Sequence, residues 1–147
     1  MANVHWVLTA DEGVGRLLRV ELTASGRAHV AVDDEIHDTW REHQHGRPSP
    51  LSGKSGHTYA SWGHEDETRR ERFAKEIAVW LERQAEDLHI DRIAVFAPPR
   101  FLGALRGAWS PRLAIRVDEH HGDLTHLSPG HLACYDSIIR LVSDAHT

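Results

Sequence analysis

One short apolar segment constrains the fold of this chain more than any other feature. Residues 92–97 read Arg-Ile-Ala-Val-Phe-Ala, an almost continuous apolar run that is typical of a strand buried on both faces of a sheet. Pro98 and Pro99 end the strand, and Pro99 suits the first turn of a helix over residues 99–108. A long amphipathic helix over about residues 65–88 precedes it. Helices before and after a buried strand predict an α/β domain with parallel strand pairing.

The helix over residues 65–88 is defined by its apolar face. Its apolar residues recur at three- and four-residue spacing: Phe73, Ile77, Trp80, Leu81 and Leu88. Residues 65–67, Glu-Asp-Glu, give the first turn an acidic character that suits the positive end of the helix dipole. We therefore expect this apolar face, with Trp80 in the core, to pack on the sheet.

The first third of the sequence predicts strands. Alternating or β-rich runs over residues 4–9, 14–22 and 28–36 are separated by turn signals at 11–13 and 24–26. Short turns between consecutive strands predict an antiparallel three-stranded meander.

The C-terminal part of the chain predicts one more strand and one helix. Residues 113–117 alternate as a strand, and residues 118–123 read as a polar turn. Ser128 as N-cap and Pro129 at the first helical position start the last helix, which places Cys134 near its buried side. The expected buried face is Tyr135, Ile138, Ile139 and Val142. With the earlier elements, this gives a single α/β domain with a mixed sheet over residues 1–147.

Residues 41–63 interrupt the regular pattern. They contain four glycines, two prolines and three histidines, and they show neither helical nor strand periodicity. Loops longer than about 12–15 residues inside a compact domain are usually functional or disordered. The segment is therefore predicted to be a long flexible loop and a candidate functional surface.

The chain is acidic overall and has a single cysteine. Its 147 residues fit one domain, and its formal net charge of −5 gives no global positive field to attract nucleic acid at neutral pH, so no DNA partner is expected. Cys134 alone forms neither an intramolecular disulfide nor a cysteine-based metal site. No stretch approaches the ~18 apolar residues of a membrane span, and the first residues lack the pattern of a signal peptide. We therefore expect a cytoplasmic protein without membrane contact.

The sequence gives little support for a metal site or for a catalytic nucleophile. His120 and His121 are adjacent, and adjacent residues on a strand point to opposite faces, so we expect no metal site there. The histidines of residues 41–63 have no evident rigid frame. No serine lies in a G-x-S-x-G motif, and a buried helical Cys134 is more often packing than chemistry. We expect no cofactor.

Residues 97–106, Ala-Pro-Pro-Arg-Phe-Leu-Gly-Ala-Leu-Arg, cross from the carboxyl end of the central strand to the start of a helix. Open α/β sheets tend to bind ligands at this place, which makes Arg100 and Arg106 candidate pocket residues. The alternative is structural. In that interpretation the prolines fix the turn, Gly103 permits close packing of helix and sheet, and Arg100 pairs with a surface carboxylate.

The sequence resembles a bacterial family over nearly its whole length. The segments IDRIAVFAPPRFLGALR, DLTHLSP and RRERFAKEIAVWLERQ look like the host attachment protein family, whose members are described as required for attachment to host cells. That family in turn resembles the middle domain of archaeal and eukaryotic class I peptide release factors and of the ribosome-rescue factor Pelota. The resemblance implies a ribonuclease H-like mixed sheet.

The resemblance also implies a place for function. In release factors, the loop between the meander and the long helix carries a Gly-Gly-Gln tripeptide that positions water for ester hydrolysis. The equivalent here is residues 41–63, which contain no Gly-Gly-Gln, so peptidyl-tRNA hydrolysis is not expected. The candidate RNA-binding residues of this segment are Arg41, Arg47, Gly53, Lys54, Gly56 and His57. The segment contains the cationic side chains of Arg41, Arg47 and Lys54 and one carboxylate, that of Glu42, so it is locally basic.

Three functions remain open on the sequence. The first is a non-catalytic module that binds ribosome or tRNA through residues 41–63. The second is a direct or indirect role in host-cell attachment. The third is a small hydrolase or metal-assisted enzyme that uses the loop histidines and Arg100.

Overall fold

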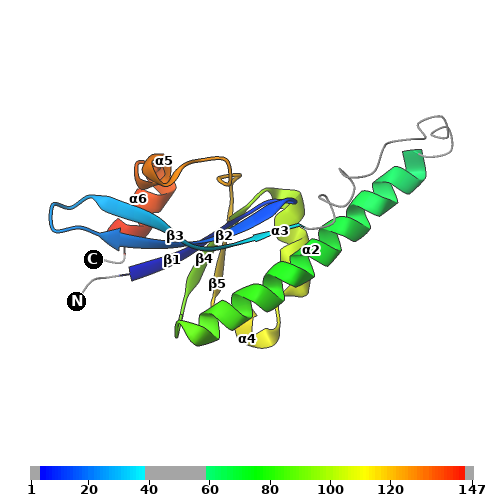
Figure 1. Cartoon of the computed structure of the whole chain (residues 1–147), viewed down its shortest axis with the longest axis horizontal. Coiled ribbons are helices and arrows are strands. Elements are labelled where there is room, and N and C mark those ends of the chain that lie inside the picture. Colours follow the sequence, from blue (N-terminus) through cyan, green and yellow to red (C-terminus); the bar gives the residue numbers. More distant parts are fainter. Residues whose placement is uncertain (1–3, 39–58, 145–147) are drawn as a thin grey trace.

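The computed structural model describes residues 4–38 and 59–144 (Figure 1). They form a mixed five-stranded sheet in the order β3-β2-β1-β4-β5. The strands are β1 (Val4–Ala10), β2 (Val14–Leu22), β3 (Ala28–His37), β4 (Ile93–Ala97) and β5 (Val117–His121). The first three pair antiparallel, whereas β4 pairs parallel with β1 and β5 pairs parallel with β4. The predicted single α/β domain with an N-terminal meander and a mixed sheet is therefore confirmed.

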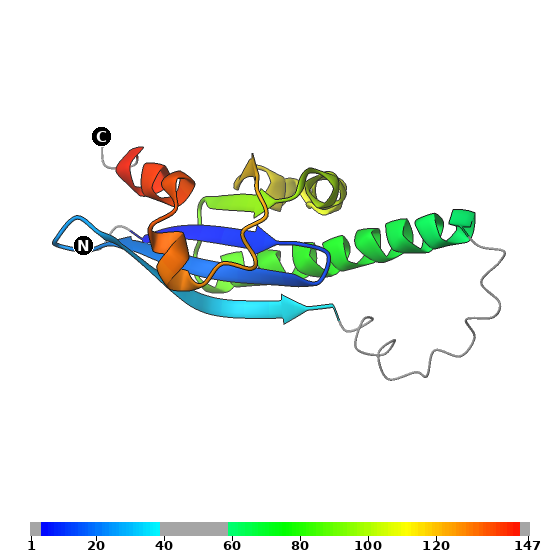
Figure 2. The ribbon, with the colours of Figure 1, turned by 90° about the horizontal axis from the view of Figure 1, so that it is seen from above.

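Helices cover the sheet from both sides. The helices are α2 (Tyr59–Asp87), α3 (Pro99–Ala108), α4 (Pro111–Ala114), α5 (Pro129–Ala133) and α6 (Asp136–Asp144). Residues of α2, α3 and α4 pack on one face, and residues of α5 and α6 pack on the other. Figures 1 and 2 show these layers, with the first turns of α2 reaching beyond the sheet.

The interior strand β4, between β1 and the edge strand β5, contributes to two hydrophobic cores. Ile93, Val95 and Ala97 pack with α2 and α3, and Ala94 and Phe96 pack toward α5 and α6. All five residues are buried, as the continuous apolar run predicts. Fully burying a large apolar side chain contributes about 1.5–3 kcal/mol, so the two cores fix the sheet between its helices.

The long helix differs from the expectation at its start. Helix α2 begins at Tyr59, six residues before the predicted start, so residues 59–63 of the expected loop are helical. Gly63, which reads as a loop residue, is tolerated inside a helix at about 1 kcal/mol relative to alanine. Phe73 and Leu81 are fully buried as predicted, but Trp80 lies half-buried at the edge of the core.

Beyond α3, the predicted strand over residues 113–117 is wrong. Ser110 and Pro111 start the short helix α4 instead, and the Ser110 side chain accepts a hydrogen bond from the backbone N–H of Leu113 at 3.2 Å. The strand follows in residues 117–121, which read as a polar turn in the sequence. Because β5 is an edge strand, it needs no regular apolar alternation.

The last helix is interrupted. It starts at Ser128 as predicted, but α5 ends at Ala133 and α6 begins at Asp136. Cys134 lies at this break and is exposed, so its predicted burial is wrong. Of the expected buried face, Ile138 and Val142 are buried, whereas Tyr135 and Ile139 are about two-fifths exposed, at 39% and 41%.

Two glycines have different structural roles. A Cβ atom on Gly15 of β2 would come within 3.1 Å of Ile36 and 3.3 Å of Ile77, so this glycine permits close approach of α2 to the sheet. A Cβ atom on Gly103 would meet nothing within 4 Å, and the residue is exposed. The close packing expected at Gly103 therefore occurs at Gly15.

Candidate functional site

The residues singled out in the sequence fall in two groups. Arg41, Arg47, Gly53, Lys54, Gly56 and His57 lie outside the described residues. Arg100 is exposed on α3 and forms no hydrogen bond or ion pair with another described residue. Arg106 donates to Glu119 Oε1 from Nη2 at 2.7 Å and from Nε at 2.9 Å, and this hydrogen-bonded carboxylate raises the pKa of Arg106. Neither Arg100 nor Arg106 lines the groove described below.

A polar clasp holds the carboxyl edge of the sheet, where β1 and β5 end. Asp11 Oδ1 accepts backbone N–H bonds from Gly13 at 2.8 Å and Val14 at 2.9 Å, which fixes the β1–β2 turn. The other carboxylate oxygen of Asp11, Oδ2, accepts a hydrogen bond from the Thr125 hydroxyl at 2.6 Å. The Thr125 hydroxyl also lies 3.1 Å from Asp123 Oδ1. The clasp therefore ties the segment after β5 to the β1–β2 turn.

Arg16 extends this clasp to the edge strand. Its Nη1 donates to the backbone carbonyl of Thr125 at 2.6 Å, and its Nε donates to Glu35 at 2.7 Å. Farther along the DLTHLSP segment, Ser128 Oγ accepts from the His131 backbone N–H at 3.3 Å as the N-cap of α5. The motif residues that carry the family resemblance therefore act here as structural connections.

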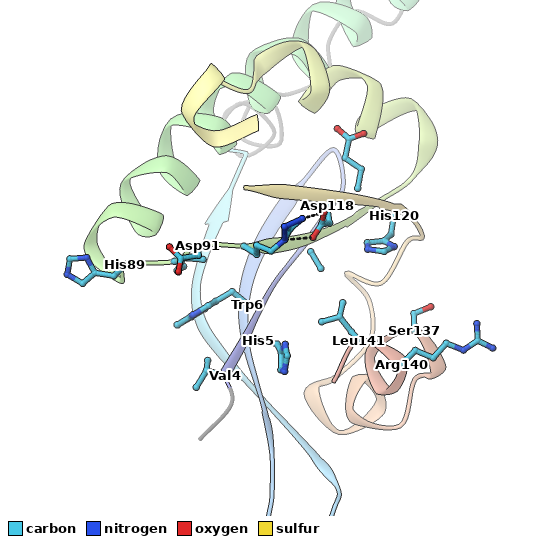
Figure 3. Close-up of a pocket in the computed structure, with 14 residues that line it drawn as sticks. Val4, His5, Trp6, His89, Asp91, Asp118, His120, Ser137, Arg140 and Leu141 are labelled. Carbon is cyan, nitrogen blue, oxygen red and sulfur yellow. Dashed lines mark hydrogen bonds and ion pairs between the residues drawn. The ribbon is translucent and has the colours of Figure 1, made fainter. Parts of the chain in front are cut away.

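A groove lies at the opposite end of the sheet (Figure 3). Its volume is about 980 Å³. The groove is lined by the starts of β1 and β4, by β5, by the turn after α2, and by α6. The lining residues used below are His5, Ala94, Asp118, His120, Ser137 and Arg140.

The groove exists because the sheet is wider than the helices that cover this face. Helix α5 contacts β3 and helix α6 contacts β2, and Ala94 and Phe96 of β4 pack in the core formed with α5 and α6, which leaves β5 at the edge of this covered face. Ala94 of β4 lies at the floor of the groove, and its small side chain leaves space above it. The neighbouring floor residues on β5 are Asp118 and His120, which pair in register with Ala94 and Phe96.

The acidic groups at the groove are mostly neutralised. Arg92 donates to both carboxylate oxygens of Asp118 at 3.3 Å, and Arg106 neutralises Glu119. Arg140 forms no hydrogen bond or ion pair with the other described residues, which leaves its positive charge at the rim. Figure 3 places Asp91 at the far end of the groove, away from Arg140.

Two imidazoles lie near the α6 wall. The His120 ring stacks on Phe96 with centroids 4.7 Å apart and an interplanar angle of 16°, which holds it in place. Burial lowers the pKa of His5 and keeps it neutral near pH 7. Its Nε2 is buried without a hydrogen-bond partner among the described residues.

The polar lining of the groove consists mainly of hydrogen-bond donors. Within the described part of the chain, no hydrogen bond links Ser137 to an imidazole. Within residues 4–38 and 67–142, no three histidine, cysteine or carboxylate side chains cluster as metal ligands. The groove instead offers a guanidinium, a hydroxyl and an imidazole as hydrogen-bond donors.

The groove was not foreseen from the sequence, although one signal was present. His5, Ser137 and Arg140 come from opposite ends of the chain and form no motif. The signal is the alternation of Asp118 and His120, which places two polar side chains on one face of a strand. It was missed because those residues read as a turn.

Comparison with known proteins identifies the family. The family model described as "Protein required for attachment to host cells" matches residues 6–135, which is most of the chain. The chain belongs to this host attachment family. No curated protein matches its sequence. Among the described helices of this host attachment family member, none combines the length and apolar character needed to cross a membrane.

Proposed function

We propose that this host attachment family member is a cytoplasmic, non-catalytic RNA-binding module. It contacts ribosome or tRNA through residues 41–63, and its effect on attachment is indirect. In this proposal the sheet is of the ribonuclease H-like type and the domain corresponds to the middle domain of release factors. The module binds without hydrolysing peptidyl-tRNA, since Gly-Gly-Gln is absent from the sequence.

The strand order carries this proposal. The sheet, ordered β3-β2-β1-β4-β5, combines an antiparallel meander with two added parallel strands, which is consistent with the mixed sheet that the resemblance implies. The connection between β3, which ends at His37, and α2, which begins at Tyr59, is the one that holds the catalytic tripeptide in release factors. This agreement supports residues 41–58 as the contact segment.

The charge of that connection supports an RNA partner. Residues 41–58 contain Arg41, Arg47 and Lys54 against Glu42, within a chain of formal net charge −5. A local excess of cations in an acidic protein favours a localised contact with phosphates.

The test is binding to ribosomes and tRNA at two salt concentrations. We expect the full chain to sediment with ribosomes or bind tRNA at low salt, and its affinity to fall as salt rises. Replacing Arg41, Arg47 and Lys54 together with alanine should weaken binding. It should also flatten the log–log salt dependence by about 0.7 per lost single-strand phosphate contact.

A matched control separates local contacts from net charge. Replacing Arg27, Arg100 and Arg112 with alanine removes the same charge from exposed positions elsewhere. This control should bind as the parent chain does, and both triple variants should melt near the parent temperature. Equal loss of binding in the two variants, or no binding by the parent at low salt, would refute the RNA contact.

A direct role at the cell surface is the second candidate, and the family description favours it. The two candidates predict different locations. Protease treatment of intact cells should degrade a directly acting surface protein and should spare one that acts from the cytoplasm. A host-cell attachment assay with the Arg41, Arg47 and Lys54 triple variant then tests whether attachment depends on these charges.

A further inference from the structure

The groove beside α6 is independent of the segment proposed to bind RNA. It opens at the amino-terminal ends of the parallel strands, near His5 and Arg92. Strand β3 ends at His37 at the other end of the sheet, where the Asp38 backbone N–H donates to the Gly13 carbonyl beyond β1. A ligand in the groove would therefore occupy a second site.

Arg140 is the charged residue of α6 that lines the groove, and Asp136, four residues before it in the same helix, is not among the lining residues. Asp118 is held by Arg92 at 3.3 Å, and Glu119 is held by Arg106 at 2.7 Å. The other acidic lining residue, Asp91, lies at the far end of the groove (Figure 3). Arg140 therefore contributes a positive charge that no described acidic side chain pairs.

Three kinds of hydrogen-bond donor line this side. Helix α6 contributes Ser137 and Arg140 to the lining, and Figure 3 shows the Arg140 side chain extending outward from the rim. Strand β5 contributes the His120 imidazole across from Ser137. A guanidinium, a hydroxyl and an imidazole on two facing elements suit the several oxygens of a phosphate group.

The remaining surface suits an organic body attached to the phosphate. Leu141 and Ala94 form apolar wall and floor, and the His120 ring is already stacked on Phe96. Pockets for small molecules are mostly about 300–1,000 Å³, and the groove, at about 980 Å³, lies within that range. A planar ring could continue the stack of His120 and Phe96 while apolar parts contact Leu141.

We infer that this groove binds a small organic phosphate, with the phosphate at Ser137, Arg140 and His120 and a planar body against the β4–β5 floor. The site is a binding site and not a catalytic one. His5 lines the part of the groove at the start of β1 and is not assigned a contact with the phosphate.

The test uses adenosine 5′-monophosphate as the probe, with adenosine and inorganic phosphate as partial probes. Binding to the full chain is measured by isothermal titration calorimetry and by amide shifts in nuclear magnetic resonance spectra. We expect the monophosphate to bind more tightly than either partial probe and to shift amides of β5 and α6.

Variants assign the phosphate contact. Arg140→Gln and Ser137→Ala should each weaken binding of the monophosphate, the first by about tenfold or more, since it removes a charged donor. Arg100→Gln is the matched control, because it removes an exposed arginine that does not line the groove. It should leave the affinity unchanged.

Each contrary result overturns the inference. Equal affinity for adenosine and its monophosphate would remove phosphate recognition. Equal weakening by Arg140→Gln and Arg100→Gln would indicate general charge attraction. No binding of the monophosphate at millimolar concentration would show that the groove does not bind this class of ligand. Binding of a short RNA in the groove, without binding of the monophosphate, would show that the ligand is RNA and not a small organic phosphate. None of these outcomes tests the role of residues 41–63, which is measured with the separate triple variant.

Discussion

Replacing Thr125 with valine tests the polar clasp at the carboxyl edge of the sheet. Valine keeps the shape of threonine but removes the hydroxyl that donates to Asp11 Oδ2 at 2.6 Å. Thr125 is only 4% exposed, so water replaces the lost donor poorly. The other Asp11 oxygen remains satisfied by the Gly13 and Val14 backbone N–H groups.

The magnitude follows from the type of bond. A hydrogen bond to a charged group contributes about 1.5–3 kcal/mol, and Asp11 is half-buried, which allows water to compensate part of the loss. We expect Thr125→Val to lower the free energy of unfolding by about 1.5–2 kcal/mol. Thr125→Ser keeps the hydroxyl and loses one methyl group, so it should lower it by about 0.8 kcal/mol.

Urea unfolding followed by far-ultraviolet circular dichroism measures both changes. A double-mutant cycle with Asp11→Asn should give a coupling of about 1 kcal/mol, because the two side chains share one bond. The reasoning is refuted if Thr125→Val lies within about 0.5 kcal/mol of the parent, the usual range of a neutral surface change. It is equally refuted if the serine variant loses as much stability as the valine variant.

Three further outcomes test the packing and the titration of the fold. Gly15→Ala should destabilise the protein, because its Cβ would press on side chains of β3 and α2, whereas Gly103→Ala should stabilise it by about 0.5–1 kcal/mol through helix propensity; thermal melting compares the two. Burial lowers the pKa of His5, so the unfolded chain takes up this proton more readily and stability should fall as pH drops through about 6.5. His5→Gln should reduce that fall, and an unchanged pH profile would contradict the assignment. Trp80→Phe should lose about 1 kcal/mol in urea unfolding, because it removes the indole N–H bond to Asp34 at 3.0 Å while a smaller aromatic ring still occupies this half-buried position.

Local patterns in the sequence were sufficient for the elements whose burial follows from their own residues. Strand β4 was predictable because every residue from Ile93 to Ala97 is apolar, a pattern that a strand buried on both faces requires. Helix α3 was equally predictable, since Pro99 sets its first turn and three apolar residues form one face. The same holds for the start of α5 at Ser128.

Elements at the edge of the fold were not predictable in the same way. Strand β5 carries polar residues at positions 118–121 because it pairs on one side only and has no helix above one face. Trp80 fits the apolar period of α2, yet it lies at the core boundary because its indole N–H reaches Asp34 of β3. The spacing of apolar residues along a helix does not show where the neighbouring strand or helix ends.

The sequence by itself determined the α/β class, the meander, the central strand and the family resemblance, because each depends on residues close together in the chain. Only the tertiary structure decided what the motif residues do and where a ligand could bind. Thr125 meets Asp11 across more than one hundred residues, and His5, His120 and Arg140 reach one groove from three separate segments. The groove depends on the difference between the width of the sheet and the reach of α5 and α6, which is a property of packing and leaves no local pattern in the sequence.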